Sequence, residues 1–84
     1  MGSKYPNGLR HMAPTDDVVT DYDRAHFQRY VRLLDARKQG VSADDMCRHI
    51  LEIDPASEPE NAKLILTSHL DRATWMSRVG FHKI

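Results

Sequence analysis

The sequence predicts an all-α domain of three helices in a helix-turn-helix-like arrangement. Two observations lead to this prediction: apolar residues recur with helical spacing in three segments, and residues that favour helix ends bound each segment. The helices are expected over residues 21–38, 43–53 and 58–78. With 84 residues, the chain has room for one small domain, residues 21–84, behind a flexible N-terminal segment, residues 1–20.

The N-terminal segment has no helical period. Pro6-Asn7-Gly8 and Ala13-Pro14 are combinations typical of turns and helix breaks, which is why flexibility is expected here.

The first helix is expected to begin at Thr20 or Asp21, whose side chains can accept hydrogen bonds from free N–H groups of the first turn. It should end before Gly40, because glycine readily takes the left-handed conformation that follows many helices. Its predicted core stripe has i, i+3, i+4, i+7 spacing. The stripe consists of Phe27, Tyr30, Val31 and Leu34, and is widened by Tyr22, Leu33 and Ala36.

The second helix is expected to start after Ser42, an N-cap residue with Asp45 three positions later. Asp54-Pro55 should end it, since the residue before a proline disfavours the helical conformation. Its predicted apolar face consists of Met46, Cys47, Ile50 and Leu51.

The third helix is expected to start at a capping box, Ser57-Glu58-Pro59-Glu60, with proline in the first turn, where it is tolerated. Gly80 should close it. The predicted core stripe consists of Ala62, Ile65, Leu66, His69, Leu70, Ala73 and Met76. The position of His69 on this stripe indicates a structural, buried histidine.

The charge pattern disfavours DNA binding. Twelve Lys and Arg balance twelve Asp and Glu, whereas nucleic-acid-binding domains usually show a basic surplus or stripe. In a helix-turn-helix reader, the second helix and the start of the third approach the duplex. Here that region carries one arginine, Arg48, among acidic residues, which would repel phosphates. The acidic residues are Asp44, Asp45, Glu52, Asp54, Glu58 and Glu60.

No catalytic or metal-binding pattern is found. None of the five histidines has the i, i+4 spacing of a helical metal site, and Cys47 lies on a predicted core face, where a thiol is inert. A glycine-rich phosphate loop and a nucleophile elbow are also missing. We therefore expect no enzyme activity, no metal and no cofactor.

Several features predict a cytoplasmic protein. No apolar run approaches the roughly 20 residues of a membrane span, and the start lacks a signal-peptide pattern. A single cysteine cannot form an internal disulfide, which is typical of a reducing compartment.

A second apolar face on the third helix carries the functional hypothesis. Leu64, Ser68, Trp75 and Val79 lie beside or opposite the core stripe, where a three-helix domain has little to cover them. One interpretation is a protein contact anchored by tryptophan. The other is that the first helix or the N-terminal segment buries Trp75 as ordinary core. The basic residues Lys63, Arg72, Arg78 and Lys83 do not share one face and are interpreted as solvated helix surface.

Residues 22–84 resemble a known family. The resemblance is carried by Tyr22-Asp23-Arg24-Ala25-His26, Tyr30-Val31-Arg32-Leu33-Leu34-Asp35-Ala36, His69-Leu70-Asp71-Arg72-Ala73 and Gly80-Phe81-His82-Lys83-Ile84. These motifs are similar to the QseM-like antiactivators, small helix-turn-helix-like domains found in regulators of rhizobial integrative and conjugative elements. Longer relatives have an Arg-rich stretch where residues 74–82 here are mostly apolar and neutral, with Arg78 as the one arginine. This departure also disfavours DNA binding.

The resemblance implies a three-helix, helix-turn-helix-like fold and a role in quorum-sensing control of horizontal gene transfer. It implies protein partners, a TraR-like LuxR-type regulator and an FseA-like activator, whose inhibition represses element excision and conjugation. A sequence-specific DNA-binding regulator is the alternative, and a dimerising accessory subunit is a third possibility, with a monomer favoured. The expected partner-binding residues are Leu64, Arg72, Trp75, Arg78, Val79 and Phe81.

Overall fold

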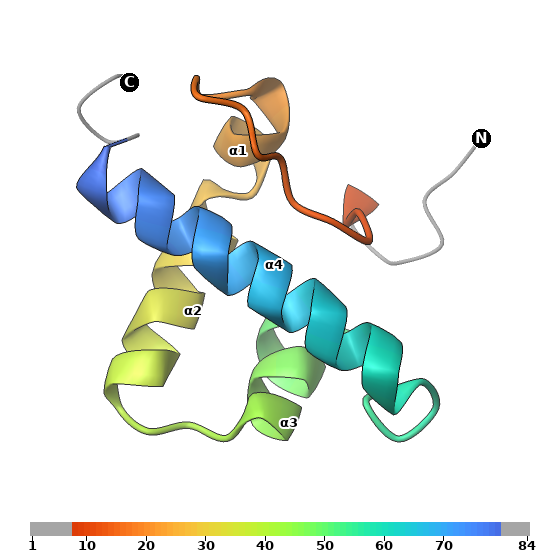
Figure 1. Ribbon diagram of the computed structural model, residues 1–84. Coiled ribbons are helices and arrows are strands. Elements are labelled where there is room, and N and C mark those ends of the chain that lie inside the picture. Colours follow the sequence, from red (N-terminus) through yellow and green to blue (C-terminus); the bar gives the residue numbers. More distant parts are fainter. Residues whose placement is uncertain (1–7, 80–84) are drawn as a thin grey trace.

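Helices make up most of the fold in the computed structural model, which describes residues 8–79. The elements are α1 (Asp21–Ala25), α2 (Phe27–Lys38), α3 (Ala43–Met46), the π-helical turn η2 (Cys47–Leu51) and α4 (Pro59–Arg78). The long helix α4 lies across α2 and the α3–η2 pair, and the N-terminal segment runs along its other side (Figure 1). The all-α prediction is confirmed.

The first predicted helix is interrupted at His26, so a continuous helix over residues 21–38 is wrong. Thr20 caps α1 as predicted: its hydroxyl accepts from the Asp23 N–H, and the Asp23 carboxylate accepts from the Thr20 N–H. His26 then leaves the helical conformation, with φ −110° and ψ 18°, and its ring is buried against Tyr22. The helix is thus interrupted at the residue whose ring is buried against Tyr22.

After the break, α2 presents a different face to the core than its periodicity predicted. Phe27 and Val31 are 37% and 44% exposed, so their assignment to the core stripe is wrong. Tyr30, Leu33 and Ala36 are buried, and Leu34 is half-buried. The buried face of α2 thus lies to one side of the predicted stripe, because α4 packs against Tyr30 and Leu33.

The second helical region begins as predicted, and its four predicted apolar residues are all buried. Ser42 accepts from the Asp45 N–H, but the helix ends at Leu51 through a π-helical turn instead of reaching residue 53. Glu52 follows with a left-handed φ of 59°. The end is held from α2, since Arg29 donates to the Ile50 carbonyl at 2.9 Å and Arg32 donates to the His49 carbonyl at 2.9 Å.

Helix α4 begins at Pro59. The predicted capping box is absent at this start, so that prediction is wrong. Glu58 occupies the N-cap position without a side-chain cap, and Ser57 donates instead to the Asp54 carboxylate. The predicted core stripe is confirmed: its residues are buried except Leu70, which is half-buried. The predicted stop at Gly80 lies outside the described residues.

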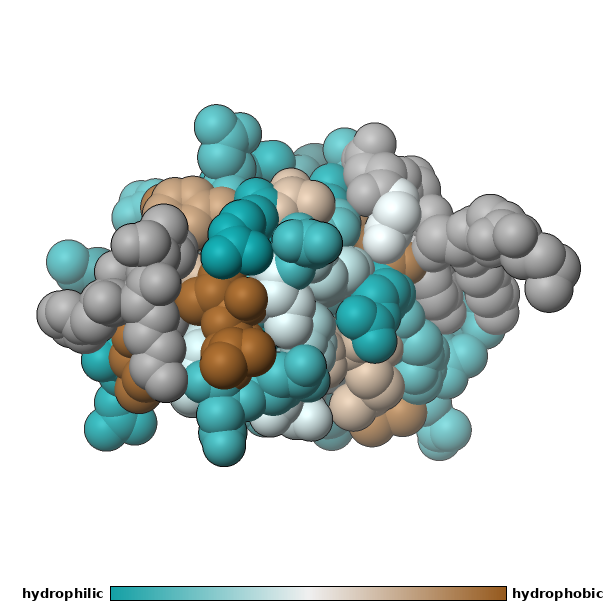
Figure 2. All heavy atoms as spheres, turned by 90° about the horizontal axis from the view of Figure 1, so that it is seen from above, coloured by the Kyte–Doolittle hydropathy of each residue, from teal (hydrophilic) through white to brown (hydrophobic). Residues whose placement is uncertain are grey.

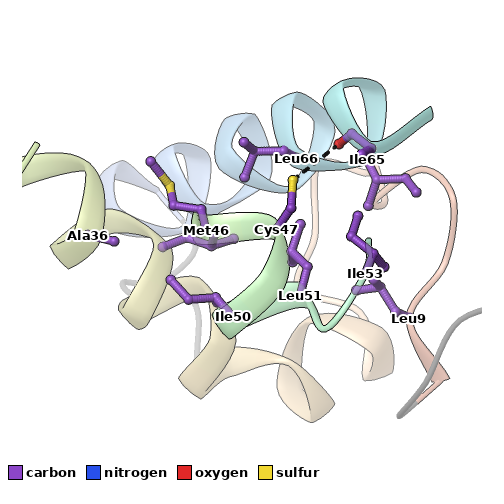
Figure 3. Close-up of a cluster of buried hydrophobic side chains, with 11 residues drawn as sticks. Leu9, Ala36, Met46, Cys47, Ile50, Leu51, Ile53, Ile65 and Leu66 are labelled. Atoms are coloured by element: carbon purple, nitrogen blue, oxygen red, sulfur yellow. Dashed lines mark hydrogen bonds between the residues drawn. The ribbon is translucent and has the colours of Figure 1, made fainter. Parts of the chain in front are cut away.

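The apolar core has two clusters. The larger one joins α2, the α3–η2 pair, the first half of α4 and Leu9 of the N-terminal segment (Figure 3). Within it, the Cys47 thiol lies 3.7 Å from the Ala62 carbonyl, to which it can donate a weak hydrogen bond. The smaller cluster, built on Tyr30, Ala73 and Met76, includes the partly buried Trp75.

The described part of the N-terminal segment, from Gly8 onward, is packed into this fold, which corrects the expectation of flexibility for this part of residues 1–20. Leu9 is fully buried and Ala13 is 5% exposed. We call residues 9–19 the strap. It follows α4 because α4 carries polar and apolar partners for it on its second face, outside the core stripe. Residues 1–7 lie outside the described part of the chain.

Candidate protein-binding surface

The second face of α4 is organised around the buried guanidinium of Arg72. Its Nε and one terminal nitrogen donate to the two oxygens of Asp23, at 3.0 and 2.7 Å. The terminal nitrogens also donate to the strap carbonyls of Asp16, at 2.6 Å, and Val18, at 2.8 Å. One side chain therefore ties α4 both to α1 and to the strap.

The Asp23 carboxylate is saturated with donors. Besides Arg72, it accepts from the Tyr30 hydroxyl at 2.8 Å and from the Thr20 N–H at 2.9 Å. Burial alone would raise the pKa of Asp23, but the hydrogen bonds from Arg72, Thr20 and Tyr30 outweigh it and lower the pKa to about 2. The pair is therefore charged at neutral pH.

This network contradicts the predicted role of Arg72 in partner binding. The residue is 4% exposed, and its charge is matched by Asp23 inside the domain. Arg72 is an internal anchor because the α1 capping box places Asp23 directly against α4. The two residues lie 49 positions apart, so no local spacing in the sequence indicated the pair.

Trp75 lies at the boundary between core and surface. The Arg72 guanidinium carbon is 3.9 Å from the centroid of its indole ring, a cation–π contact that holds the ring in place. The side chain is partly buried and packs against the smaller core cluster. Its exposed part borders a hollow of about 240 Å³, lined by Met12, Pro14, Thr15, Ser68, Asp71, Arg72 and Trp75.

The strap covers the middle of the face that was expected to be uncovered. The Ala13 N–H donates to the Ser68 hydroxyl at 2.7 Å, between the exposed Leu64 on one side and Trp75 on the other. Leu64 is 51% exposed and Val79 is 38% exposed, and Arg78 is also exposed. Phe81, the remaining expected contact, lies outside the described residues. The structure therefore leaves separate apolar positions along α4 instead of one open stripe.

The space-filling view shows how hydrophobic surface is distributed on one face of the molecule (Figure 2). Figure 2 looks down on the side of the molecule where α1 lies in Figure 1, and shows a compact hydrophobic area with hydrophilic side chains above and below it. The exposed large apolar residues of the described chain also include Met12 and Val18 from the strap. The strap therefore adds apolar surface as well as covering it.

His69 lies buried behind the strap, as its position on the apolar stripe predicted. Its Nδ1–H donates to the Ile65 carbonyl at 2.7 Å, so Nε2 accepts from the Tyr22 hydroxyl at 2.6 Å. Tyr22 in turn accepts from the Arg10 N–H at 3.0 Å, which connects this chain of hydrogen bonds to the strap. Burial is the main reason that the pKa of His69 falls to about 4.

We expect this histidine to make the domain sensitive to mild acid. Its pKa is 6.5 when unfolded and about 4 when folded, so stability present above pH 6.5 is lost as pH falls toward 4. Between pH 6.5 and about pH 5 the free energy of unfolding should drop by about 2 kcal/mol. Urea denaturation at both pH values, followed by circular dichroism, measures the loss.

The control for this effect is the His69→Gln variant, which cannot titrate in this range. Its loss of stability on acidification should be clearly smaller than that of the wild type. A remainder is expected from His26, whose pKa is also lowered by burial and by the nearby Arg29. Equal losses in the two proteins would show that His69 is not held neutral.

Exposed charge is unevenly placed around the fold. Arg29 and Arg32 of α2 are engaged with the carbonyls that end η2, while the acidic side chains of the α3 side remain at the surface. On α4, Lys63 and Arg78 are exposed, but Arg72 is not. The exposed acidic residues of this region are Asp44, Asp45, Glu52, Asp54 and Glu60.

Other chemistry is sparse within residues 8–79. These residues contain no group of three His, Cys, Asp or Glu side chains able to hold a metal ion. Cys47 is buried, which raises the pKa of its thiol. None of the helices described is both long and apolar enough to cross a bilayer.

No protein-family model and no curated protein matches this sequence.

Proposed function

We propose that this protein is a cytoplasmic antiactivator that binds transcription activators and blocks their action. The partners are a LuxR-type quorum sensor and a related excision activator, and the outcome is repression of conjugative element excision and transfer. The resemblance of residues 22–84 to the QseM-like family names these partners. The structure adds support for a protein partner over a DNA duplex.

The supporting observation is the charge at the corner that a helix-turn-helix protein turns toward DNA. Asp44 and Asp45 are exposed at the start of α3, and Glu60 is exposed in the first turn of α4. Phosphate neutralisation by Lys and Arg supplies much of the affinity of DNA-binding proteins. Here Arg72, the central arginine of α4, pairs with the buried Asp23 and does not contribute positive charge to the surface.

Contact with the activator would use the apolar positions that remain exposed on α4. Leu64, Trp75 and Val79 share one side of the helix, and exposed apolar groups of this kind are favourable at protein interfaces. Bound there, the protein would prevent the activator from reaching its promoter or its own partners.

The test compares two variants, each of which replaces one exposed apolar residue with serine. Leu64→Ser lies on the proposed surface, and Val31→Ser lies on α2, with exposed fractions of 51% and 44%. Because both side chains are largely exposed, neither change should move the free energy of unfolding by more than about 0.5 kcal/mol. We expect Leu64→Ser to weaken repression and pull-down of the activator about tenfold, and Val31→Ser to leave both unchanged.

A promoter gel shift in the same experiment separates the two function classes. The wild-type protein should shift no promoter DNA by itself at physiological salt, but should remove the shift caused by the activator. A shift by the protein alone, weakening steeply as salt rises, would favour the DNA-binding alternative. Wild-type protein that neither binds nor represses the activator would refute the proposed function.

A further inference from the structure

The strap and α4 together form a surface that neither makes alone. Met12 and Val18 of the strap are 50% and 59% exposed, and Met12 lines the same hollow as the partly exposed Trp75. Contacts of Arg72 place these elements together, since its guanidinium touches the Asp16 and Val18 carbonyls and the Trp75 ring. We call Met12, Asp16, Val18, Asp71 and Trp75 the strap–α4 patch.

The patch combines an apolar hollow with acidic side chains. Asp71 and Met12 line the hollow of about 240 Å³ that Trp75 borders. The carboxylates of Asp16 and Asp71 are exposed, and neither forms an ion pair with another residue of the described range 8–79. Arg72 hydrogen-bonds the backbone carbonyl of Asp16 and not its carboxylate, which interacts with the Arg72 charge only at longer range.

The Arg72 charge does not oppose a cationic partner here, because Asp23 compensates it inside the domain. The indole is also held before any partner arrives, by Arg72 on its ring and by the packing of the smaller cluster. An ordered aromatic side chain at the edge of a hollow loses little conformational freedom on binding, which favours its use as an anchor.

We propose that the strap–α4 patch binds a basic amphipathic helix of the partner protein. An apolar side chain of that helix enters the hollow beside Trp75, and flanking lysine or arginine side chains pair with Asp16 and Asp71. The proposal rests on the proposed function and specifies what the activator presents. Basic segments of this kind are what activators use against DNA phosphates. Binding would therefore compete directly with promoter DNA.

Intrinsic fluorescence can test the site, since Trp75 is the single tryptophan of the chain. The full-length protein is titrated with three synthetic peptides: leucine and lysine in amphipathic helical order, the same composition scrambled, and leucine and glutamate in the amphipathic order. The first should shift the Trp75 emission and bind saturably. The other two should bind at least about tenfold more weakly, since one lacks the apolar face and the other has the wrong charge.

Matched charge variants locate the contact. Asp16→Asn with Asp71→Asn removes both patch carboxylates, while Asp44→Asn with Asp45→Asn removes two exposed carboxylates on α3. We expect the first pair to raise the Kd of the leucine–lysine peptide about three- to tenfold, and the second to change it less than about twofold. Thermal melts by circular dichroism verify that both double variants are folded.

The outcomes distinguish this inference from the proposed function. Equal effects of the two double variants, or equal binding of the scrambled peptide, would overturn the patch as the docking site. Wild-type protein that represses the activator, with Asp16→Asn/Asp71→Asn repressing equally well, would leave the antiactivator function in place and refute the patch. Peptide binding that follows the expected pattern while the wild type fails to repress would refute the function alone.

Discussion

Replacing Arg72 with methionine is expected to destabilise the domain by about 3–5 kcal/mol, because it leaves the Asp23 carboxylate buried and unpaired. Small domains lie toward the low end of a total stability of about 5–15 kcal/mol, so the variant should keep only part of its margin of stability at room temperature and melt well below the wild type. Urea denaturation followed by circular dichroism at neutral pH measures the change. Trp75 fluorescence should report it as well, since the ring loses its contact with Arg72.

An exposed ion pair gives the control for this variant. Arg24 pairs with Asp21 at 3.4 Å on the surface of α1, and Arg24→Met should change stability by at most about 1 kcal/mol. The double variant Asp23→Leu/Arg72→Met should be more stable than Arg72→Met, because no unpaired charge remains buried. A small effect of Arg72→Met would show that water reaches Asp23 and that the network is not closed.

Truncating Leu9 to alanine is expected to cost about 2–5 kcal/mol, as for other fully buried leucines. The residue lies in the larger core cluster, together with side chains of α2, η2 and α4 (Figure 3). Met12→Ala, three residues later on the same strap but 50% exposed, should change stability by less than about 0.5 kcal/mol. Urea denaturation of both variants measures the difference.

Similar small effects of the two strap substitutions would contradict the packing of Leu9 in the core. In that case the strap would be attached only through its backbone and would contribute little to stability. A large effect of Leu9→Ala alone would show that residues before the first helix belong to the folded domain.

Local sequence signals predicted the features that depend on neighbouring residues. The Thr20 and Ser42 caps and the buried faces of the second and third helical regions follow from spacing within a single turn or helix. The positions of Leu64 and Val79 at the surface also follow from the periodicity of α4. These features needed no knowledge of where the other helices lie.

Features that depend on distant contacts were missed. The periodicity of residues 27–34 could not show which side of α2 meets α4, so Phe27 and Val31 were placed in the core. The turn residues of the strap gave no sign that Leu9 is buried. The sequence around Arg72 is that of an ordinary surface cation, because its partner Asp23 lies in a distant segment. Each of these depends on an interaction between segments far apart in the chain.

The way the strap is attached has a consequence for how recognition could change. Its hydrogen bonds to the helices use main-chain groups of the strap. The N–H groups of Arg10 and Ala13 donate to the hydroxyls of Tyr22 and Ser68. The carbonyls of Asp16 and Val18 accept from Arg72. The side chains at positions 12, 16 and 18 are exposed and make none of these hydrogen bonds. Point substitutions at these three positions should therefore change which partner the strap binds, while its backbone keeps the same position along α4.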